Sequence, residues 1–319
     1  MPPRNLPVPG TPSPQIQKLI SAPLRPGWDV LPKSDEEWRQ VVDAGAAATL
    51  KTLPGLVDRM KVNVEKTTIE GVRAFIVTPH SILPDKRHRV LIHMHGGCYV
   101  FLPGESGLRE AVMMAGFGGF RVISVDYRMP PEAHFPAALD DGISVYKHAL
   151  QTSDPKHVAI FGTSAGGALT LAIVLRAKQE GIPLPAAIAP GTPMSDVTGV
   201  GDTFYTNELV DNVLVSRDGI CQAAAQYYAA GHDLKDPLIS PVYGDMAGFP
   251  PTILTSGTRD LLLSNTVRVH RKLRQAGVEA YLQIFEGQSH AQYQFDDSAP
   301  ETKEAFAEIS DFFDKHMAK

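Results

Sequence analysis

The sequence has few cysteines: only Cys98 and Cys221 occur among its 319 residues. Two cysteines build neither the multiple-disulfide framework of a small secreted domain nor a paired-cysteine zinc site, and they give no reason to expect an oxidising compartment. We therefore expect no disulfide framework and no structural metal, and we predict a cytoplasmic location.

Long hydrophobic runs and an excess of basic residues are missing as well. No run approaches the roughly 20 apolar residues of a membrane span, and the proline-rich first 20 residues lack the apolar core of about 7–15 residues that a signal peptide has. The net charge of −5 leaves no basic face to neutralise phosphates. We expect no stable membrane association and no nucleic-acid partner.

Short apolar runs alternate with helical patterns from about residue 60 onward. This alternation is typical of a mostly parallel sheet with helices on both faces, whose strands are nearly continuous apolar runs. Glu70-Gly71, between the first two runs, predicts a tight antiparallel hairpin. The predicted strands are 61–69, 72–78, 89–95, 121–126, 157–162, 186–191, 251–257 and 279–285, and the predicted helices lie near 106–117, 136–150, 165–180, 264–276 and 301–317.

Two segments fall outside this alternation. Residues 1–55 combine prolines with short amphipathic helical stretches, and residues 197–243 have helical rather than strand character. We predict that both segments are parts of a helical cap. The cap would cover one α/β domain made of residues 56–196 and 244–319.

The sharpest local motif is Gly162-Thr163-Ser164-Ala165-Gly166-Gly167, which lies between a predicted strand and a predicted helix. A serine on such a sharp turn has strained backbone angles, and small neighbours let the chain pass close to it while its hydroxyl projects into a cleft. The helix N-terminus favours developing negative charge there. The motif predicts a nucleophilic Ser164, and the alternative is a glycine-rich turn with a capping serine.

A second motif, His95-Gly96-Gly97-Cys98, directly follows another predicted strand. Glycines let backbone N–H groups come close to a substrate oxygen, and the N–H of Ala165 would complete an oxyanion hole. We predict that Gly96, Gly97 and Ala165 form this hole and that His95 has a structural role. An ordinary turn after a strand is the alternative.

A serine nucleophile needs a base that accepts its proton, and that base must be oriented by an acid. In this type of site the acid and then the histidine follow the serine along the chain, each after a later strand. His290 follows the eighth predicted strand. Three other histidines also follow Ser164, in the predicted cap, in mid-helix and near the C-terminus: His232, His270 and His316. His290 is therefore the predicted base.

The acid has more than one candidate. Asp260 follows the seventh predicted strand and is favoured, but Asp196 follows the sixth, and some proteins with this arrangement place the acid one strand earlier. Asp202 and Glu286 are weaker candidates, since Glu286 would need an unusual local turn to reach the imidazole of His290.

Together these motifs resemble the hormone-sensitive lipase family, and in particular its bacterial esterases with a GTSAGG elbow. The similar residues are HGG at 95–97, the block VDYRMPPEAHFPAALDD at 125–141, GTSAGG, DPLISPVYG, GFPPTILTSGTRD and EGQSH. The resemblance extends from about residue 60 to the C-terminus. It implies an α/β-hydrolase fold with an eight-stranded, mostly parallel sheet, a helical cap, the triad Ser164, Asp260 and His290, and no cofactor.

The resemblance also implies an activity, the hydrolysis of short- to medium-chain carboxylic esters through an acyl-enzyme intermediate. A lactonase, amidase or peptidase would use the same triad, and a non-catalytic small-molecule receptor is the rival from another class, because a fold does not fix a function. The expected partner is a small-molecule ester. Members of this family often dimerise through an edge strand, here the eighth.

One residue departs from the family pattern: Cys98 stands where the common HGGG loop has its fourth glycine. Its side chain makes Cys98 a candidate for the substrate pocket. The thiol is expected either to react with thiol reagents or to be buried and inert. Within the block 125–141, Arg128 is expected to hold the oxyanion loop.

Overall fold

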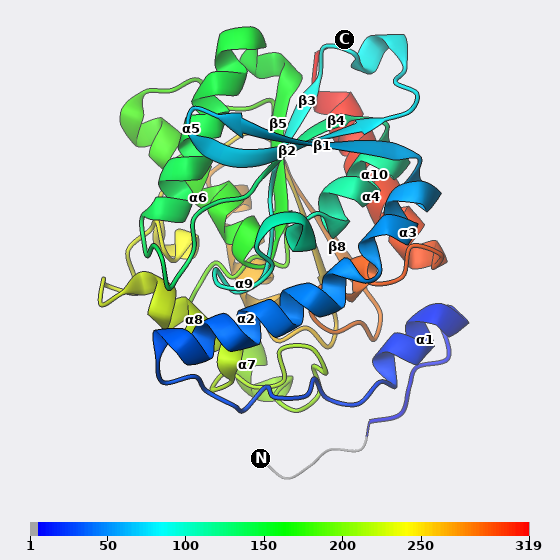
Figure 1. Cartoon of the computed structure of the whole chain (residues 1–319), viewed down its shortest axis with the longest axis vertical. Coiled ribbons are helices and arrows are strands. Elements are labelled where there is room, and N and C mark those ends of the chain that lie inside the picture. The colour runs from blue at the N-terminus through cyan, green and yellow to red at the C-terminus, as the bar shows by residue number, and fades with distance from the viewer. Residues whose placement is uncertain (1–5, 319) are drawn as a thin grey trace.

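The computed structural model describes residues 6–318, so the first five residues of the predicted cap segment 1–55 and the last residue of 244–319 lie outside the description. An eight-stranded sheet forms the centre of the molecule, in the order β1-β2-β4-β3-β5-β6-β7-β8 (Figure 1). Strand β2 is antiparallel to β1 and β4, and the other pairings are parallel. The strands are β1 (Val62–Ile69), β2 (Val72–Pro79), β3 (Val90–Met94), β4 (Arg121–Val125), β5 (Val158–Thr163), β6 (Ala187–Gly191), β7 (Thr252–Gly257) and β8 (Ala280–Phe285). The predicted mostly parallel sheet is confirmed.

Helices cover both faces of this sheet (Figure 1). They are α4 (Arg109–Gly118), α5 (Ala137–Thr152), α6 (Ala165–Glu180), α9 (Leu263–Gln275) and α10 (Pro300–His316). The buried side chains form two large clusters. Helices α5, α6 and α9 contribute Val145, Leu171 and Val269 to one cluster, and α4 and α10 contribute Val112 and Phe313 to the other. The predicted helices are confirmed, with ends that differ by at most three residues.

Local chemistry explains where strands turn and where the sheet ends. Glu70 (φ 50°) and Gly71 (φ 81°) both have positive φ in the turn that joins β1 to β2, which matches the right-handed twist of the two strands. All five residues of β3 are buried, as in a central strand, whereas burial varies along the edge strand β8. The carboxyl ends of β3, β5, β7 and β8 therefore meet at one edge, where the predicted site residues lie.

The segment 197–243, here called the cap segment, is less helical than predicted. It contains α7 (Thr203–Thr206), α8 (Ile220–Ala229) and the short 3-10 turn Pro241–Tyr243, and turns and loops make up the rest. Short polar side chains compete with helical hydrogen bonds for the backbone. Asp211, for example, accepts hydrogen bonds from the N–H groups of Val213 (2.8 Å) and Leu214 (3.1 Å), which favours a turn.

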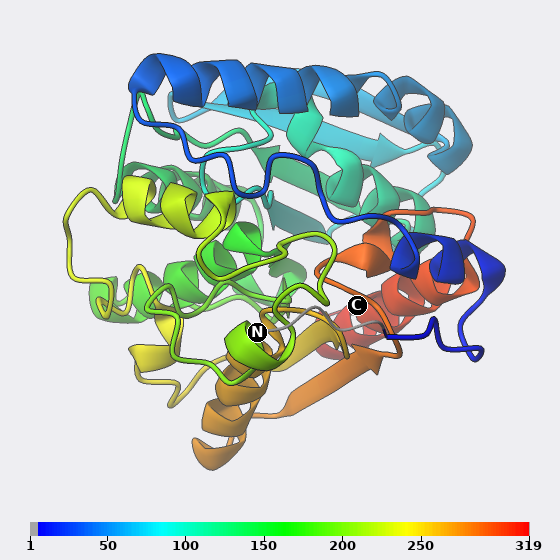
Figure 2. The same ribbon diagram turned by 90° about the horizontal axis from the view of Figure 1, so that it is seen from below.

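The N-terminal part of the chain supplies α1 (Pro14–Ile20), α2 (Asp35–Leu50) and α3 (Leu53–Met60). Residues 21–34, here called the N-terminal arm, run beside the cap segment (Figure 2), with hydrogen bonds from Arg25 N to Asn212 O (2.9 Å) and from Ile220 N to Trp28 O (2.7 Å). Trp38 of α2 stacks on the ring of Tyr227 in α8, 5.2 Å away. The two predicted cap parts thus pack against each other.

None of the helices within residues 6–318 has both the length and the apolar composition needed to cross a bilayer.

Candidate active site

Ser164 lies at the turn between β5 and α6. Its backbone angles are φ 63° and ψ −120°, which are strained for a residue with a side chain. Its N–H donates to Gly191 O (2.9 Å) and its carbonyl accepts from Met194 N (3.0 Å), so the surrounding strands hold the turn in place. This is the strand-turn-helix geometry that the motif predicts.

The glycines of the elbow are required by close packing against β3. An ideal Cβ on Gly162 would lie 2.1 Å from Met94 O, and one on Gly166 would lie 1.9 Å from the same oxygen. A side chain at either position would displace the end of β3 or the start of α6. The two glycines of G-x-S-x-G are therefore needed because the backbones of β3, β5 and α6 lie in close contact beside Ser164.

His290 and Asp260 form a buried pair beyond the ends of β8 and β7. His290 Nδ1 lies 3.0 Å from Asp260 Oδ1, and Asp260 is fully buried. Ser256 Oγ donates to Asp260 Oδ2 (2.7 Å), and Thr192 Oγ1 donates to the same oxygen. Burial raises the pKa of Asp260, but the attraction and hydrogen bond of His290, together with these hydroxyls, outweigh it, so the pKa lies below its ordinary value.

The second ring nitrogen of His290, Nε2, is buried and has no hydrogen-bond partner within residues 6–318. His290 and Ser164 line the same cavity, here called the Ser164 cavity. No hydrogen bond joins Ser164 Oγ to the imidazole within that range, as is common in unliganded enzymes, where such bonds tighten only once substrate is bound. Because Nδ1 is held by Asp260, Nε2 is the nitrogen that can accept a proton in this cavity.

The competing acids lie elsewhere. Asp196 is fully buried, but its carboxylate pairs with Arg268 and accepts hydrogen bonds from Thr198 N (2.8 Å) and Oγ1 (2.6 Å). Asp202 and Glu286 are exposed. The structure therefore brings Asp260, and none of these three, to His290.

The other late histidines do not line the Ser164 cavity. His232 is exposed and packs edge-on against Phe135. His270 Nε2 lies 3.3 Å from Ala280 O, and His316 Nε2 lies 3.6 Å from Glu279 Oε1. His232 lies in the cap segment as predicted, whereas His270 and His316 are only partly exposed.

Asp211 is a buried residue of the site that the sequence analysis missed. Its two carboxylate oxygens accept hydrogen bonds from the N–H groups of Val213, Leu214, Leu261 and His290. Burial and the nearby charge of Asp260 raise the pKa of Asp211 to about 6. Asp211 thereby joins the cap segment to the backbone of both triad loops. No motif marks it, because the sequence DNV is an ordinary turn sequence.

The loop after β3 has the backbone freedom that the glycine motif suggests. Gly97 has φ 104°, and an ideal Cβ there would lie 2.4 Å from Phe101 O. Gly97 O accepts hydrogen bonds from Val100 N (3.0 Å) and Phe101 N (2.7 Å), which close a tight turn. Gly96 and Gly97 line the Ser164 cavity, and Ala165 is the first residue of α6, beside Ser164.

His95 and Tyr127 support the start of this loop. The Tyr127 hydroxyl donates to His95 O (2.8 Å), and the two rings stack with their centroids 4.1 Å apart. Burial lowers the pKa of His95 to about 4, so its imidazole is uncharged at neutral pH. The predicted structural role of His95 is consistent with these contacts.

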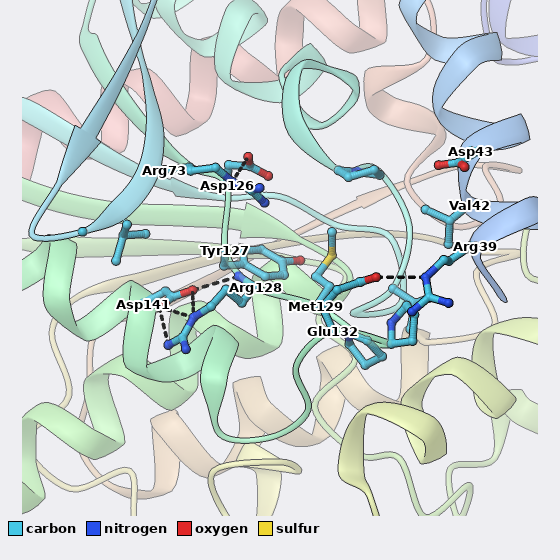
Figure 3. A pocket seen from close by; sticks show the side chains of 16 residues that line it. Arg39, Val42, Asp43, Arg73, Asp126, Tyr127, Arg128, Met129, Glu132 and Asp141 are labelled. Atoms are coloured by element: carbon cyan, nitrogen blue, oxygen red, sulfur yellow. Dashed lines mark hydrogen bonds and ion pairs between the residues drawn. The ribbon is translucent and has the colours of Figure 1, made fainter. Parts of the chain in front are cut away.

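Arg128 does not hold the oxyanion loop, so that expectation is wrong. Its guanidinium and its backbone N–H both bind Asp141, with 2.7 Å between Arg128 Nη2 and Asp141 Oδ1 (Figure 3). Asp126, two residues earlier, accepts instead a hydrogen bond from Gly104 N (2.9 Å) in the loop. The side chain of Arg128 reaches toward α5 because α5 supplies a buried carboxylate there.

Cys98 and Cys221 form a disulfide, which corrects the expectation that the two cysteines stay unpaired. The bond joins the loop after β3 to α8, with the two Cα atoms 5.3 Å apart and a sequence separation of 123. The expected reactive or inert thiol at Cys98 therefore does not exist in this structure. Only the tertiary fold brings the cap segment over the loop, so the spacing of the two cysteines carried no signal. Both residues line the Ser164 cavity.

The Ser164 cavity has a volume of about 500 Å³. Its apolar lining includes Leu102, Val213, Leu214 and Phe295, so both the sheet side and the cap segment contribute to it. Within residues 6–318, no three His, Cys, Asp or Glu side chains gather in a way that could hold a metal ion. The arrangement is suited to nucleophilic attack on a small carbonyl compound.

An α/β fold with a strained serine between strand and helix, and with an acid-histidine pair after later strands, defines a class of hydrolases. Residues 91–294, more than half of the chain, match the model of a family described as alpha/beta hydrolase fold. The chain therefore belongs to the α/β-hydrolase fold family.

Individual relatives agree with this assignment. The chain is 31% identical to an esterase of Acinetobacter venetianus over 227 residues, which cover 70% of this chain and 74% of that protein. It is 29% identical to an acetyl-hydrolase of Streptomyces hygroscopicus over 218 residues, covering 68% of this chain and 72% of the relative.

Solved structures extend the comparison to the whole fold. The crystal structure of esterase E25 superposes with a TM-score of 0.96 at 42% identity, covering 99% of this chain and 98% of that one. An esterase from the bacterial hormone-sensitive lipase family superposes with a TM-score of 0.76 at 29% identity, covering 90% of this chain and 100% of that one. The resemblance to bacterial hormone-sensitive lipases that the motifs predict is confirmed.

Proposed function

We propose that the protein is a serine carboxylesterase that hydrolyses short- to medium-chain esters through an acyl-enzyme intermediate on Ser164. The general activity, ester hydrolysis, is supported by membership of the α/β-hydrolase family and by the esterase and acetyl-hydrolase relatives.

The proposed reaction has two halves. Ser164 Oγ attacks the ester carbonyl while His290 Nε2 takes its proton, and the N–H groups of Gly96, Gly97 and Ala165 stabilise the oxyanion. The C–O bond to the alcohol then breaks, and the alcohol leaves with the proton from His290. A water molecule, deprotonated by His290, then attacks the acyl-enzyme. The bond between the acyl carbon and Ser164 Oγ breaks, Oγ takes the proton back from His290, and the acid is released.

The observation that carries this proposal is the state of the His290 ring. Nδ1 is held 3.0 Å from the fully buried Asp260, whereas the buried Nε2 has no partner in the described chain, in the cavity that Ser164 lines. An imidazole held in this way has a fixed tautomer and one nitrogen available to a substrate or a nucleophile. A non-catalytic receptor has no need for that arrangement.

Cavity size supports small substrates. A volume of about 500 Å³ lies within the usual range for small-molecule sites and accommodates a small ester with its acyl and alcohol groups. Lactones and amides enter such a cavity too, so a panel of matched ester, lactone and amide substrates separates a carboxylesterase from a lactonase or an amidase.

The assignment is tested by Ser164→Ala. This change should lower the hydrolysis of p-nitrophenyl butyrate by about 10⁴-fold or more, because the nucleophile is gone. It should also abolish labelling by a fluorophosphonate probe, while the thermal unfolding midpoint stays close to that of the parent protein. Activity that survives in the folded variant would show that another residue is the nucleophile.

The proposal also includes an oligomeric state and a cellular location. Pairing of two copies through the edge strand β8, where Tyr281 and Ile284 are exposed, is proposed as the route to a homodimer, and sedimentation of a Tyr281→Lys variant tests it. The cytoplasmic location stays a prediction. The Cys98–Cys221 disulfide removes the cysteine argument for it, since disulfides persist chiefly in oxidising compartments.

A further inference from the structure

Two arginines, Arg25 of the N-terminal arm and Arg109 at the start of α4, line the Ser164 cavity together with Ser164 and His290. Both side chains are partly buried. A buried charge is costly unless an opposite charge or several hydrogen bonds compensate for it. The partners of these two guanidinium groups therefore indicate whether the cavity is complete without a ligand.

Arg25 has no carboxylate partner within residues 6–318. Its guanidinium lies over the ring of Phe101, 5.3 Å from the ring centroid. Burial lowers the pKa of Arg25, and no acidic side chain acts against this effect. An aromatic face compensates for only part of the lost hydration of a cation. The Arg25 charge thus faces the cavity without a counter-ion.

Arg109 is similarly placed. Its one hydrogen bond in the described chain is a long one, 3.4 Å from Nη1 to Phe295 O. Burial, the largest cause, lowers the pKa of Arg109; the charges of Asp297 and Asp296 raise it, and the charge of Arg59 lowers it. Neither aspartate forms an ion pair with Arg109 in the described chain. Asp297 is occupied, because Arg59 binds both of its oxygens at 2.7 and 2.8 Å.

The arginines of a second cavity of about 500 Å³ make the contrast clear (Figure 3). Three guanidinium groups line it, and each forms an ion pair of 2.7 to 3.0 Å: Arg39 with Glu132, Arg73 with Asp126, and Arg128 with Asp141. Their side chains are 46%, 61% and 59% exposed. The three better-hydrated arginines of this second cavity have carboxylate partners, whereas Arg25 and Arg109 have no carboxylate partner within residues 6–318.

The acidic residue of the Ser164 cavity does not neutralise these charges. Glu110 accepts a hydrogen bond from Thr163 Oγ1 (2.7 Å), and its other oxygen lies 3.1 Å from His93 Nε2. Glu110 is thus bound to residues of β5 and β3, and its charge is not among the causes that shift the pKa of either arginine. The cavity therefore keeps two cationic groups that Glu110 does not pair with.

We infer that the ester substrate carries an anionic group, a carboxylate or a phosphate, which binds Arg25 and Arg109. The inference rests on the proposed esterase function and adds a substrate class to it. Guanidinium groups bind such anions through paired, charge-assisted hydrogen bonds. Arg25 also lines an adjoining cavity of about 410 Å³ that does not include Ser164, so there is room for a charged group away from the scissile bond.

The test compares matched charged and neutral esters. The p-nitrophenyl half-ester of adipic acid is paired with p-nitrophenyl pentanoate, and para-acetoxybenzoate with its methyl ester, so that the charge lies on the acyl side or on the alcohol side. A third arm, para-acetoxyphenyl phosphate, distinguishes phosphate from carboxylate. Folded Ser164→Ala protein serves as the blank for spontaneous hydrolysis.

The expected result is a higher kcat/KM for the charged member of at least one pair. Arg25→Met and Arg109→Met should each lower the ratio of charged to neutral kcat/KM about 10-fold or more, mainly through KM, because each removes a charged hydrogen bond. Arg25→Lys and Arg109→Lys keep the charge and should recover part of the ratio. Added salt should reduce the preference of the parent protein.

The matched control is Arg39→Met, which removes an arginine of the second cavity and should leave the ratio unchanged. The inference is overturned if the parent protein prefers the charged member of neither pair and hydrolyses para-acetoxyphenyl phosphate no faster than the neutral methyl ester of para-acetoxybenzoate. It is also overturned if the substitutions at Arg25 and Arg109 leave the ratio as it is. A folded parent protein that hydrolyses no ester overturns the proposed function itself. Thermal unfolding of every variant identifies losses due to misfolding.

Discussion

The two halves of the Ser164 cavity are held in different ways. On the sheet side, Ser164, Asp260 and His290 follow β5, β7 and β8, so the backbone ladder of the sheet sets their spacing. On the cap side, turns and short helices predominate. A disulfide anchors them at Cys98–Cys221, and the buried carboxylate of Asp211 ties them to the triad loops.

Because of this difference, substitutions on the two sides should affect different quantities. Many hydrogen bonds hold the sheet edge, so a substitution there should remove a reacting or orienting group, lower the rate of the chemical step and leave the fold intact. The cap depends on a few connections, among them Asn212, whose Nδ2 donates to Leu19 O (2.8 Å) and Ala22 O (2.9 Å) of the N-terminal part. Loss of one such connection should affect the free energy of unfolding more than the chemical step.

The largest effect is expected on the sheet side, from Asp260→Asn. The amide cannot stabilise a charged imidazole at His290, so kcat should fall about 10³–10⁴-fold. Asp196→Asn is the matched control, since Asp196 pairs with Arg268, and it should change kcat only a few-fold in the folded fraction. Steady-state kinetics with p-nitrophenyl butyrate measures both. Equal losses would return Asp196 to the list of possible acids.

A smaller effect is expected on the cap side, from the paired change Cys98→Ser and Cys221→Ser. Removing a crosslink that closes a loop of this size frees the unfolded chain, so the free energy of unfolding should fall by about 2–4 kcal/mol in urea titrations. A reducing agent should shift the parent protein in the same way and leave the double variant unaffected. If reduction leaves the parent unchanged, the disulfide does not hold the cap.

The smallest effect concerns pH and Asp211. Because its pKa is raised to about 6 in the folded protein, the folded state binds this proton more tightly than the unfolded chain. The protonated Asp211 carboxyl therefore contributes fully to the free energy of unfolding at pH values below the pKa that Asp211 has in the unfolded chain. This contribution is lost as the pH rises through about 6. Between pH 5 and 8 the parent protein should lose about 1 kcal/mol relative to Asp211→Asn.

Urea titrations of the parent protein and Asp211→Asn at several pH values measure that difference. Asp202→Asn, at an exposed aspartate of the same segment, is the control and should give a curve parallel to the parent curve. Parallel curves for Asp211→Asn as well would show that the Asp211 carboxyl titrates normally.

Much of the fold was predictable because its signals are local. Each strand is a short apolar run, and Gly71, which adopts positive φ freely, marks the turn between β1 and β2. The α2 boundary at Asp35 was predictable too, since Ser34 Oγ accepts a hydrogen bond from Glu37 N (3.2 Å), as an N-cap serine does. The cap segment was harder to predict. Its turns depend on side-chain hydrogen bonds such as those of Asp211, which periodicity does not reveal.

The sequence by itself determined the elbow at Ser164, the glycine loop at 96–97 and the order of the serine, acid and histidine, because each depends on residues adjacent to a strand end. Only the tertiary structure decided that Asp260 rather than Asp196 meets His290, that Cys98 bonds to Cys221, and that Arg25 and Arg109 share a cavity without a carboxylate partner in the described chain. These features join segments far apart in the chain. Their chemistry depends on burial and on partners that no local pattern encodes.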